Sequence, residues 1–281
     1  MAIAQSDKRS PAPGLAAAFP WLILAGGLTA AIGWVLFGQK LGDTIVIVDP
    51  GAAMAVYYLL LFLPLIALAL LLGIVGGQNV IRIGRDAGRW AGAGVALGLI
   101  GLMLTLGLSW LNGSVAWGSV ARAGVGGLVL GSGLTLIQVA AEEILFRGWL
   151  QPALIARIGP PAGIAVGAVL FAAFHLTAAA MGPVALVNIT LAGIWFGVLA
   201  LRSGGVLAPL AAHFAWNVTE DIVLGMTPNP GTGPLGSLLD LDLVGGPWWG
   251  AQADGLNSSI GTTVVLIALV VPFAWRWRYR A

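Results

Sequence analysis

The feature that most constrains this chain is a series of separate apolar segments, each about as long as a bilayer is thick. A transmembrane helix needs about 20 predominantly apolar residues. The 281-residue chain is 59% hydrophobic and only 9% charged, whereas a soluble domain is about 25% charged. The composition therefore excludes a soluble globular protein. We expect eight membrane-spanning segments, at residues 19–38, 52–76, 90–110, 124–147, 161–179, 183–201, 205–226 and 259–275.

The distribution of lysine and arginine predicts how these segments are oriented, because cytoplasmic loops carry an excess of both residues. With the N-terminus inside, ten basic residues fall on the cytoplasmic side and only Lys40 and Arg122 fall outside. The ten are Lys8, Arg9, Arg82, Arg85, Arg89, Arg157, Arg202, Arg276, Arg278 and Arg280. The sequence thus predicts an all-α, polytopic membrane helix bundle of about eight transmembrane helices, with both termini cytoplasmic.

The chain is expected to form one domain. Residues 1–15 are polar and contain proline, and they lack the apolar core of a signal peptide, so we expect a disordered tail. Residues 16–281 form a single transmembrane domain without an internal repeat. The longest loop, 227–258, is compatible with a hairpin, a re-entrant segment or an interfacial lid. The glycine-rich stretch 124–133 is typical of a surface on which helices pack closely.

Composition also excludes several kinds of chemistry. The net charge is only +2 and there is no basic stripe, which argues against nucleic-acid binding. The chain has no cysteine, so disulfides, thiolate metal sites and a cysteine nucleophile are excluded. His175 and His213 are the only histidines, which excludes a three-histidine zinc site.

Ionisable residues inside the predicted spans are the candidates for function. Each costs about 2.5–3.5 kcal/mol on insertion scales, so such residues are rare and usually serve a purpose. Those in this chain are Glu142, Glu143, Arg147, His175, His213, Glu220 and Asp221, and the amides Asn188 and Asn217 accompany them.

Spacing separates the two adjacent glutamates. Glu143 and Arg147 are four residues apart, with the acid first, which is the favourable order for an ion pair on a helix. Glu142 is displaced by about 100° around the helix axis and faces elsewhere. We therefore expect Glu143 to be paired with Arg147 while the Glu142 carboxylate stays free for chemistry.

The two histidines are expected to meet Glu142. His213 and Asn217 share one helix face, and His175 follows Phe171 by four residues on another helix. Counted from the cytoplasmic ends, Glu142, His175 and His213 lie about 22, 21 and 16 Å deep, at 1.5 Å per residue. Matching depth in three spans predicts a shared polar cavity.

The remaining polar residues have simpler interpretations. Asn188 is expected to form a hydrogen bond between helices. Glu220 is one turn beyond Asn217, and we interpret it as a solvated carboxylate at the end of a span. Asp221 lies beside it, and no other pattern in the sequence supports a role for it.

Three motifs together resemble those of a known family. They are Glu142-Glu143-x-x-x-Arg147, Phe171-x-x-x-His175 and His213-x-x-x-Asn217. Their type, completeness and order are similar to the CAAX prenyl endopeptidase and bacteriocin-processing family, also called CPBP or Abi. The resemblance covers a catalytic core of about residues 120–226, and it implies an eight-helix intramembrane endopeptidase of the glutamate type.

The resemblance also implies roles for the site residues. Glu142 and His175 would activate a water molecule for attack on the scissile carbonyl. His213 and Asn217 would line the oxyanion site, and the ion pair beside Glu142 would organise its helix. The implied partners are the lipid bilayer and a membrane-associated protein or peptide as substrate. The absence of cysteine and the glycine- and alanine-rich composition are compatible with a bacterial inner membrane, which is the location we expect.

Three alternatives stay open at this point. Two glutamates and two histidines could in principle bind zinc, but there is no HExxH motif and the ligands would come from three helices. We therefore expect no cofactor. A membrane scaffold or bacteriocin-immunity protein would need no free glutamate beside a paired one. A proton-coupled transporter would more often show two repeated halves.

Overall fold

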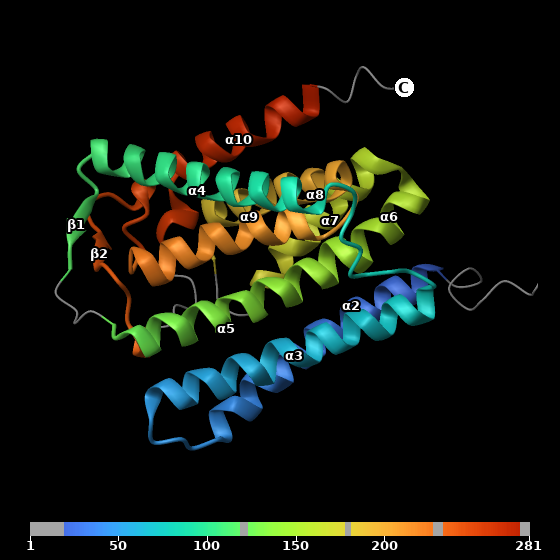
Figure 1. Cartoon of the computed structure of the whole chain (residues 1–281), viewed down its shortest axis with the longest axis horizontal. Helices are drawn as coiled ribbons and strands as arrows, with labels where there is room; N and C mark the ends of the chain where they lie inside the picture. Colours follow the sequence, from blue (N-terminus) through green and yellow to red (C-terminus); the bar gives the residue numbers. More distant parts are fainter. Residues whose placement is uncertain (1–19, 119–122, 178–180, 227–232, 276–281) are drawn as a thin grey trace, which may run out of the picture.

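The computed structural model describes residues 20–118, 123–177, 181–226 and 233–275, which form a bundle of helices (Figure 1). The predicted tail, residues 1–15, lies outside this part of the chain. The α-helices are α2 (Pro20–Thr44), α3 (Pro50–Gly76), α4 (Ala87–Leu111), α5 (Val125–Glu143), α6 (Gln151–Ile158), α7 (Pro160–His175), α8 (Pro183–Ser203), α9 (Leu207–Asn217) and α10 (Ile260–Trp275). Two π-helical segments, η1 (Ile144–Leu150) and η2 (Val218–Val223), directly follow α5 and α9.

Each expected apolar segment coincides with a helix, so the all-α class is confirmed. Five helical stretches are long and apolar enough to cross a membrane: α2, α3, α4, α8 and the continuous stretch Val125–Ile158. Helices α7 and α10 are apolar but shorter. The protein is an integral membrane protein. Eight crossings and cytoplasmic termini stay predictions.

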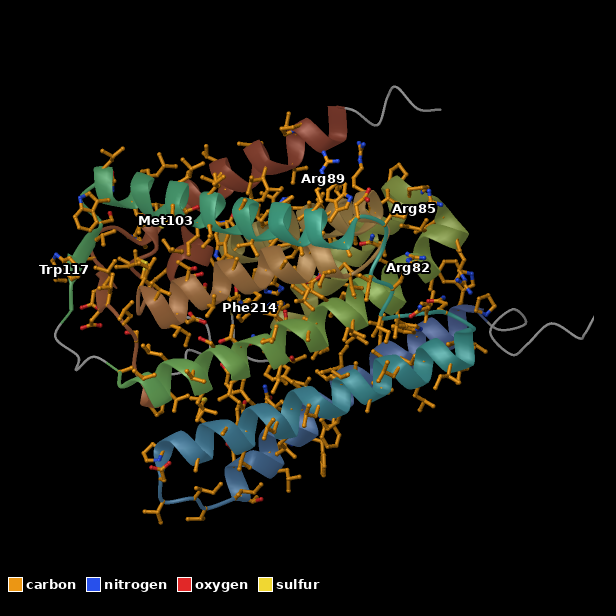
Figure 2. All side chains as sticks on the ribbon, viewed as in Figure 1. Arg82, Arg85, Arg89, Met103, Trp117 and Phe214 are labelled. Atoms are coloured by element: carbon orange, nitrogen blue, oxygen red, sulfur yellow. The ribbon has the colours of Figure 1, made fainter. Side chains whose placement is uncertain are left out.

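Large apolar side chains cover the outside of the bundle. Met103 and Leu104 on α4 are 50% and 54% exposed, for example (Figure 2). In water such a surface would drive aggregation, whereas in a bilayer it faces lipid. The helices also satisfy their own backbone hydrogen bonds, as a segment in hydrocarbon must.

The helix that carries both adjacent glutamates runs further than expected. The sequence predicts that this span ends at residue 147, but α5, η1 and α6 continue without a break to Ile158. Pro152 cannot donate a backbone hydrogen bond, and its ring needs space beside the preceding turn. The wide π turn of η1 lies directly before it and provides that space, so the helix passes the proline instead of ending there.

A small strand pair closes one end of the bundle. Strand β1 (Val115–Trp117) pairs antiparallel with β2 (Leu241–Leu243). Three short 3-10 helices, η3 (Gly233–Leu235), η4 (Pro247–Trp249) and η5 (Gly255–Ser258), complete the described part of the long loop. The described part of this loop thus pairs with the α4–α5 connection instead of forming a hairpin of its own.

Glycines let α4 approach α9 very closely. A Cβ atom at Gly94 or Gly98 would overlap the backbone carbonyl oxygen of Ala208 or Ala212, respectively. The predicted packing surface 124–133 is confirmed only in part: a Cβ atom at Gly127 would overlap the carbonyl oxygen of Leu235, whereas Gly126 and Gly133 have nothing within 4 Å of a Cβ position. The close contact lies on α4 because there the glycines recur about once per helical turn on the face that meets α9.

Replacing Gly98 with alanine should therefore destabilise the protein by about 1–3 kcal/mol, since overpacking forces two helix backbones apart. Gly107→Ala is the matched control on the same helix, because a Cβ there meets nothing within 4 Å. It should be neutral or stabilising by up to about 1 kcal/mol. Thermal unfolding in detergent measures both variants. Equal melting temperatures for the two variants would contradict the packing argument.

Candidate active site

A cavity of about 310 Å³ lies inside the bundle between α2, α3, α5, α7, α8, α9, α10 and the loop before α10. Four residues predicted for catalysis line it: Glu142, His175, His213 and Asn217. They come from three helices, α5, α7 and α9, so the fold brings together side chains from separate parts of the sequence. The other two predicted residues, Glu143 and Arg147, lie behind this lining in the protein core.

Glu143 holds two partners with one oxygen. Its Oε1 atom accepts a hydrogen bond from Nη1 of Arg147 at 2.9 Å and another from Nδ1 of His213 at 2.9 Å. Glu143 is fully buried, and Nη2 of Arg147 also donates to the carbonyl oxygen of Gly193 on α8. The expected Glu143–Arg147 pair is present. The contact with His213 could not be found from spacing, because the two residues are 70 positions apart.

The contact with Glu143 fixes the state of the His213 ring. A carboxylate oxygen only accepts, so Nδ1 of His213 carries a proton. The opposite nitrogen, Nε2, then faces the cavity. It lies 3.3 Å from Nδ2 of Asn217 and 3.9 Å from Oε2 of Glu142. Glu143 thus acts on His213 as an orienting carboxylate does on a catalytic histidine.

The two oxygens of Glu142 have different surroundings. Oε1 accepts a hydrogen bond from Nε2 of Gln138 at 3.3 Å. Oε2 is buried and has no hydrogen-bond partner among the described residues. One oxygen is therefore held by Gln138, while the other is buried without a hydrogen-bond partner among the described residues. Gln138 was missed in the sequence, although it lies one helical turn before Glu142.

Aromatic rings support this cluster. Phe196 stacks on the His213 ring with a centroid distance of 4.7 Å and an interplanar angle of 21°. The Arg147 guanidinium lies 4.2 Å from the ring centroid of Phe171, a cation–π distance that helps stabilise a buried cation. Phe171 belongs to a predicted motif, whereas no sequence signal indicated Phe196.

His175 is placed differently from His213. It is half-buried, and its Nδ1 lies 2.8 Å from the carbonyl oxygen of Phe171. A carbonyl only accepts, so Nδ1 carries the proton and Nε2 keeps its lone pair. The Phe171 and His175 rings meet edge to face at 4.7 Å. The FxxxH spacing therefore fixes both the tautomer and the orientation of this histidine.

The other buried polar residues divide into one confirmed and one wrong prediction. Asn188 donates to the carbonyl oxygens of Asn257 and Ser259 and accepts from Thr263, so it joins α8 to α10 as predicted. Glu220 is fully buried rather than solvated, and its Oε2 accepts from Nε1 of Trp216 at 2.9 Å. The reason is that η2 continues the helix past Asn217 and packs against α4 and α5.

The donor geometry does not fit a resident metal ion. In the described ranges, no group of three or more histidine and carboxylate side chains is arranged to hold one. We therefore derive no catalytic step through a metal.

Fold and site together define a membrane-embedded helix bundle with a buried glutamate–histidine centre. Residues 125–219 match the family described as type II CAAX prenyl endopeptidase Rce1-like. This stretch contains all six predicted site residues and is a domain of that CPBP/Abi family, and membership of the family implies a protease. No curated protein matches the chain.

Arg147→Met should lower the yield of folded protein before it changes the chemistry. The substitution leaves the fully buried Glu143 carboxylate without its cation, a loss of about 3–5 kcal/mol for a buried pair. Size-exclusion profiles and melting curves in detergent measure the effect. Arg89→Met, at an exposed position on α4, is the control and should behave as the wild type. An Arg147→Met protein that purifies normally and loses only activity would contradict this role.

Proposed function

We propose that this protein is an intramembrane endopeptidase that hydrolyses a peptide bond in a membrane-associated protein or peptide. The observation that carries the proposal is the buried Glu142 Oε2 atom. It has no hydrogen-bond partner among the described residues and lies 3.9 Å from Nε2 of His213 at the wall of the cavity. A carboxylate placed in this way can act as a general base toward a water molecule.

The proposed reaction begins with a water held by Glu142 and His175. Glu142 takes one proton from the water, and the oxygen bonds to the scissile carbonyl carbon. Nε2 of His175 accepts a hydrogen bond from the same water and fixes its direction. When the carbon–nitrogen bond breaks, the proton on Glu142 moves to the departing amide nitrogen. The products are a carboxylic acid and an amine, and Glu142 is returned to its carboxylate form.

His213 and Asn217 are proposed to stabilise the oxyanion. Nδ2 of Asn217 and Nε2 of His213 are 3.3 Å apart, so both can reach one oxygen in the cavity. Donation by His213 requires a proton on Nε2 as well as on Nδ1. Two glutamates and one arginine leave one negative charge, which a protonated His213 would neutralise. Oriented donors in such a water-poor site stabilise developing charge strongly.

The cavity also suits a polypeptide in the membrane. Its volume of about 310 Å³ is at the lower end of the range for ligand sites, which suits a few residues of extended chain. Its lining includes Phe62, Phe174 and Ile189 beside the polar centre. We propose that the membrane is a bacterial inner membrane, because a cysteine-free chain rich in glycine and alanine is compatible with that setting.

Glu142→Gln should abolish cleavage while the protein still inserts and purifies, because glutamine has nearly the same shape but cannot act as a base. The assay is cleavage of a fluorogenic peptide library in detergent or nanodiscs, with and without a strong chelator. Asp242→Asn, at an exposed position on β2, is the control and should leave turnover unchanged. Normal turnover by Glu142→Gln would remove this residue from the proposed role, and loss of wild-type activity in chelator would favour a zinc enzyme.

Asn217→Ala should lower kcat by about 10²–10³ and leave KM nearly unchanged, because an oxyanion donor acts mainly in the transition state. His175→Ala should lower kcat further than Asn217→Ala does, since it disturbs both the position and the activation of the water molecule. Steady-state kinetics and melting curves on the same preparations measure this. A large rise in KM for Asn217→Ala at unchanged kcat would show that Asn217 binds the substrate's ground state, and the oxyanion role would fall.

A further inference from the structure

The geometry points to an active site that opens on the extracytoplasmic side of the membrane. The substrate would then be an exported or outward-facing segment of a membrane-associated polypeptide, of neutral or basic character. The substrate part of this inference rests on the proposed endopeptidase function. The direction of the opening does not, because it follows from the positions of the cavity and the charges alone.

The cavity belongs to one end of the bundle. It is lined by Tyr57 near the start of α3, by His175 at the end of α7 and by Thr262 at the start of α10. It is also lined by Ala253 and Asp254 from the loop that follows β2. Helices α3 and α10 both begin at the end of the bundle that carries β1 and β2 (Figure 1).

Burial along the cavity shows which way it opens. Glu142, His213 and Asn217 are buried at its inner end, whereas Asp254 is half-buried and Ala253 is exposed. A separate hollow of about 250 Å³ approaches from the opposite end and reaches Arg147, but none of the four proposed catalytic residues lines it. The ion pair of Arg147 and Glu143 therefore separates the catalytic cavity from that side.

Charge divides the two ends of the bundle. Arg82, Arg85 and Arg89, in and after the α3–α4 connection, lie at the end opposite to Trp117 of β1 (Figure 2). Arg157 and Arg202 end α6 and α8 at the arginine-bearing side. In the described residues at the cavity end, Lys40 is the one basic side chain outside the site itself, and the acidic ones are Asp43, Asp49, Asp240, Asp242 and Asp254.

This asymmetry sets the orientation of the protein. Loops rich in arginine stay in the cytoplasm, where the anionic leaflet also attracts them. The arginine-bearing end is therefore cytoplasmic, and the cavity opens on the other side. A substrate that ends in the cytoplasm would have to cross the bundle to reach Glu142, whereas an exported segment meets the opening directly.

The lining also selects the charge of the segment that enters. Glu142 and Asp254 line the cavity, and none of the described lining residues is lysine or arginine. The positive charge proposed for His213 is already balanced within the group of two glutamates and Arg147, so a carboxylate brought into this space would be desolvated beside Glu142 and Asp254 without a further cation to pair with, which is costly. A neutral or lysine-bearing segment avoids that cost.

The native absence of cysteine allows a direct test of the opening. Ala253→Cys reports the cavity mouth, and Gly88→Cys reports the arginine-bearing end, where a Cβ meets nothing within 4 Å. Both variants are first shown to react with a maleimide in detergent, and then a membrane-impermeant maleimide is added to intact spheroplasts. We expect Ala253→Cys to react and Gly88→Cys to react only after permeabilisation. The reverse pattern, or equal reaction of both, would overturn the inference.

Cleavage tests the substrate part separately. Two impermeant quenched peptides, differing only in lysine or aspartate beside the scissile bond, are added to spheroplasts that express the wild type or Glu142→Gln. We expect wild-type cells to cleave the lysine peptide at least tenfold faster than the aspartate peptide, and Glu142→Gln cells to cleave neither. Faster cleavage of the aspartate peptide would overturn the charge preference. Outward labelling of Ala253→Cys without cleavage by the wild type, even in detergent, would overturn the proposed function and leave the orientation standing.

Discussion

The carboxylate oxygen that Glu143 shares between Arg147 and His213 is the interaction on which the site depends. A charged group inside a bilayer protein is tolerated only where it is paired, because its desolvation is expensive. Here one oxygen neutralises a cation on its own helix and fixes a histidine on α9. Arg147 then continues the connection to the backbone of α8. The buried pair of Glu143 and Arg147 therefore connects three helices, and the contact with Glu143 sets the orientation of the His213 ring.

Close packing of α4 against α9 also helps to fix the position of the site residues on α9. Gly94 and Gly98 remove the side chains that would keep the two helices apart. As a result α9 is wedged between α4 on one side and the Glu143–Arg147 pair on the other. The glycines have no chemistry of their own, yet they limit how far His213 and Asn217 can move. Sequence, packing and chemistry are therefore linked through backbone contacts as well as through charge.

Sequence reasoning predicted what lies within one helix and missed most of what lies between helices. The pairs Glu143–Arg147 and His213–Asn217 follow from a spacing of four residues, because the helix itself brings such side chains together. The Phe196 stack on His213 depends on how α8 packs against α9, which no spacing records. Glu220 was predicted to be solvated because its span was expected to end at the membrane surface. The π turn η2 instead carries it into the core, where Trp216 binds it.

Two of the three helices that carry the site, α5 and α9, change from α to π geometry at their catalytic motifs. Segment η1 starts just after Glu143, and η2 starts just after Asn217. A π turn shifts the side chains that follow it relative to a regular helix, and such turns are frequent at functional sites. Downstream of each turn the helix therefore presents a different face. Arg147 lies within η1 and turns back onto Glu143 and toward Gly193, away from the cavity. Glu142 and Glu143 both precede η1, so their different directions come from the offset of about 100° between neighbouring positions of a regular helix. Glu142 therefore lines the cavity, whereas Glu143 points into the core, where Arg147 of η1 meets it.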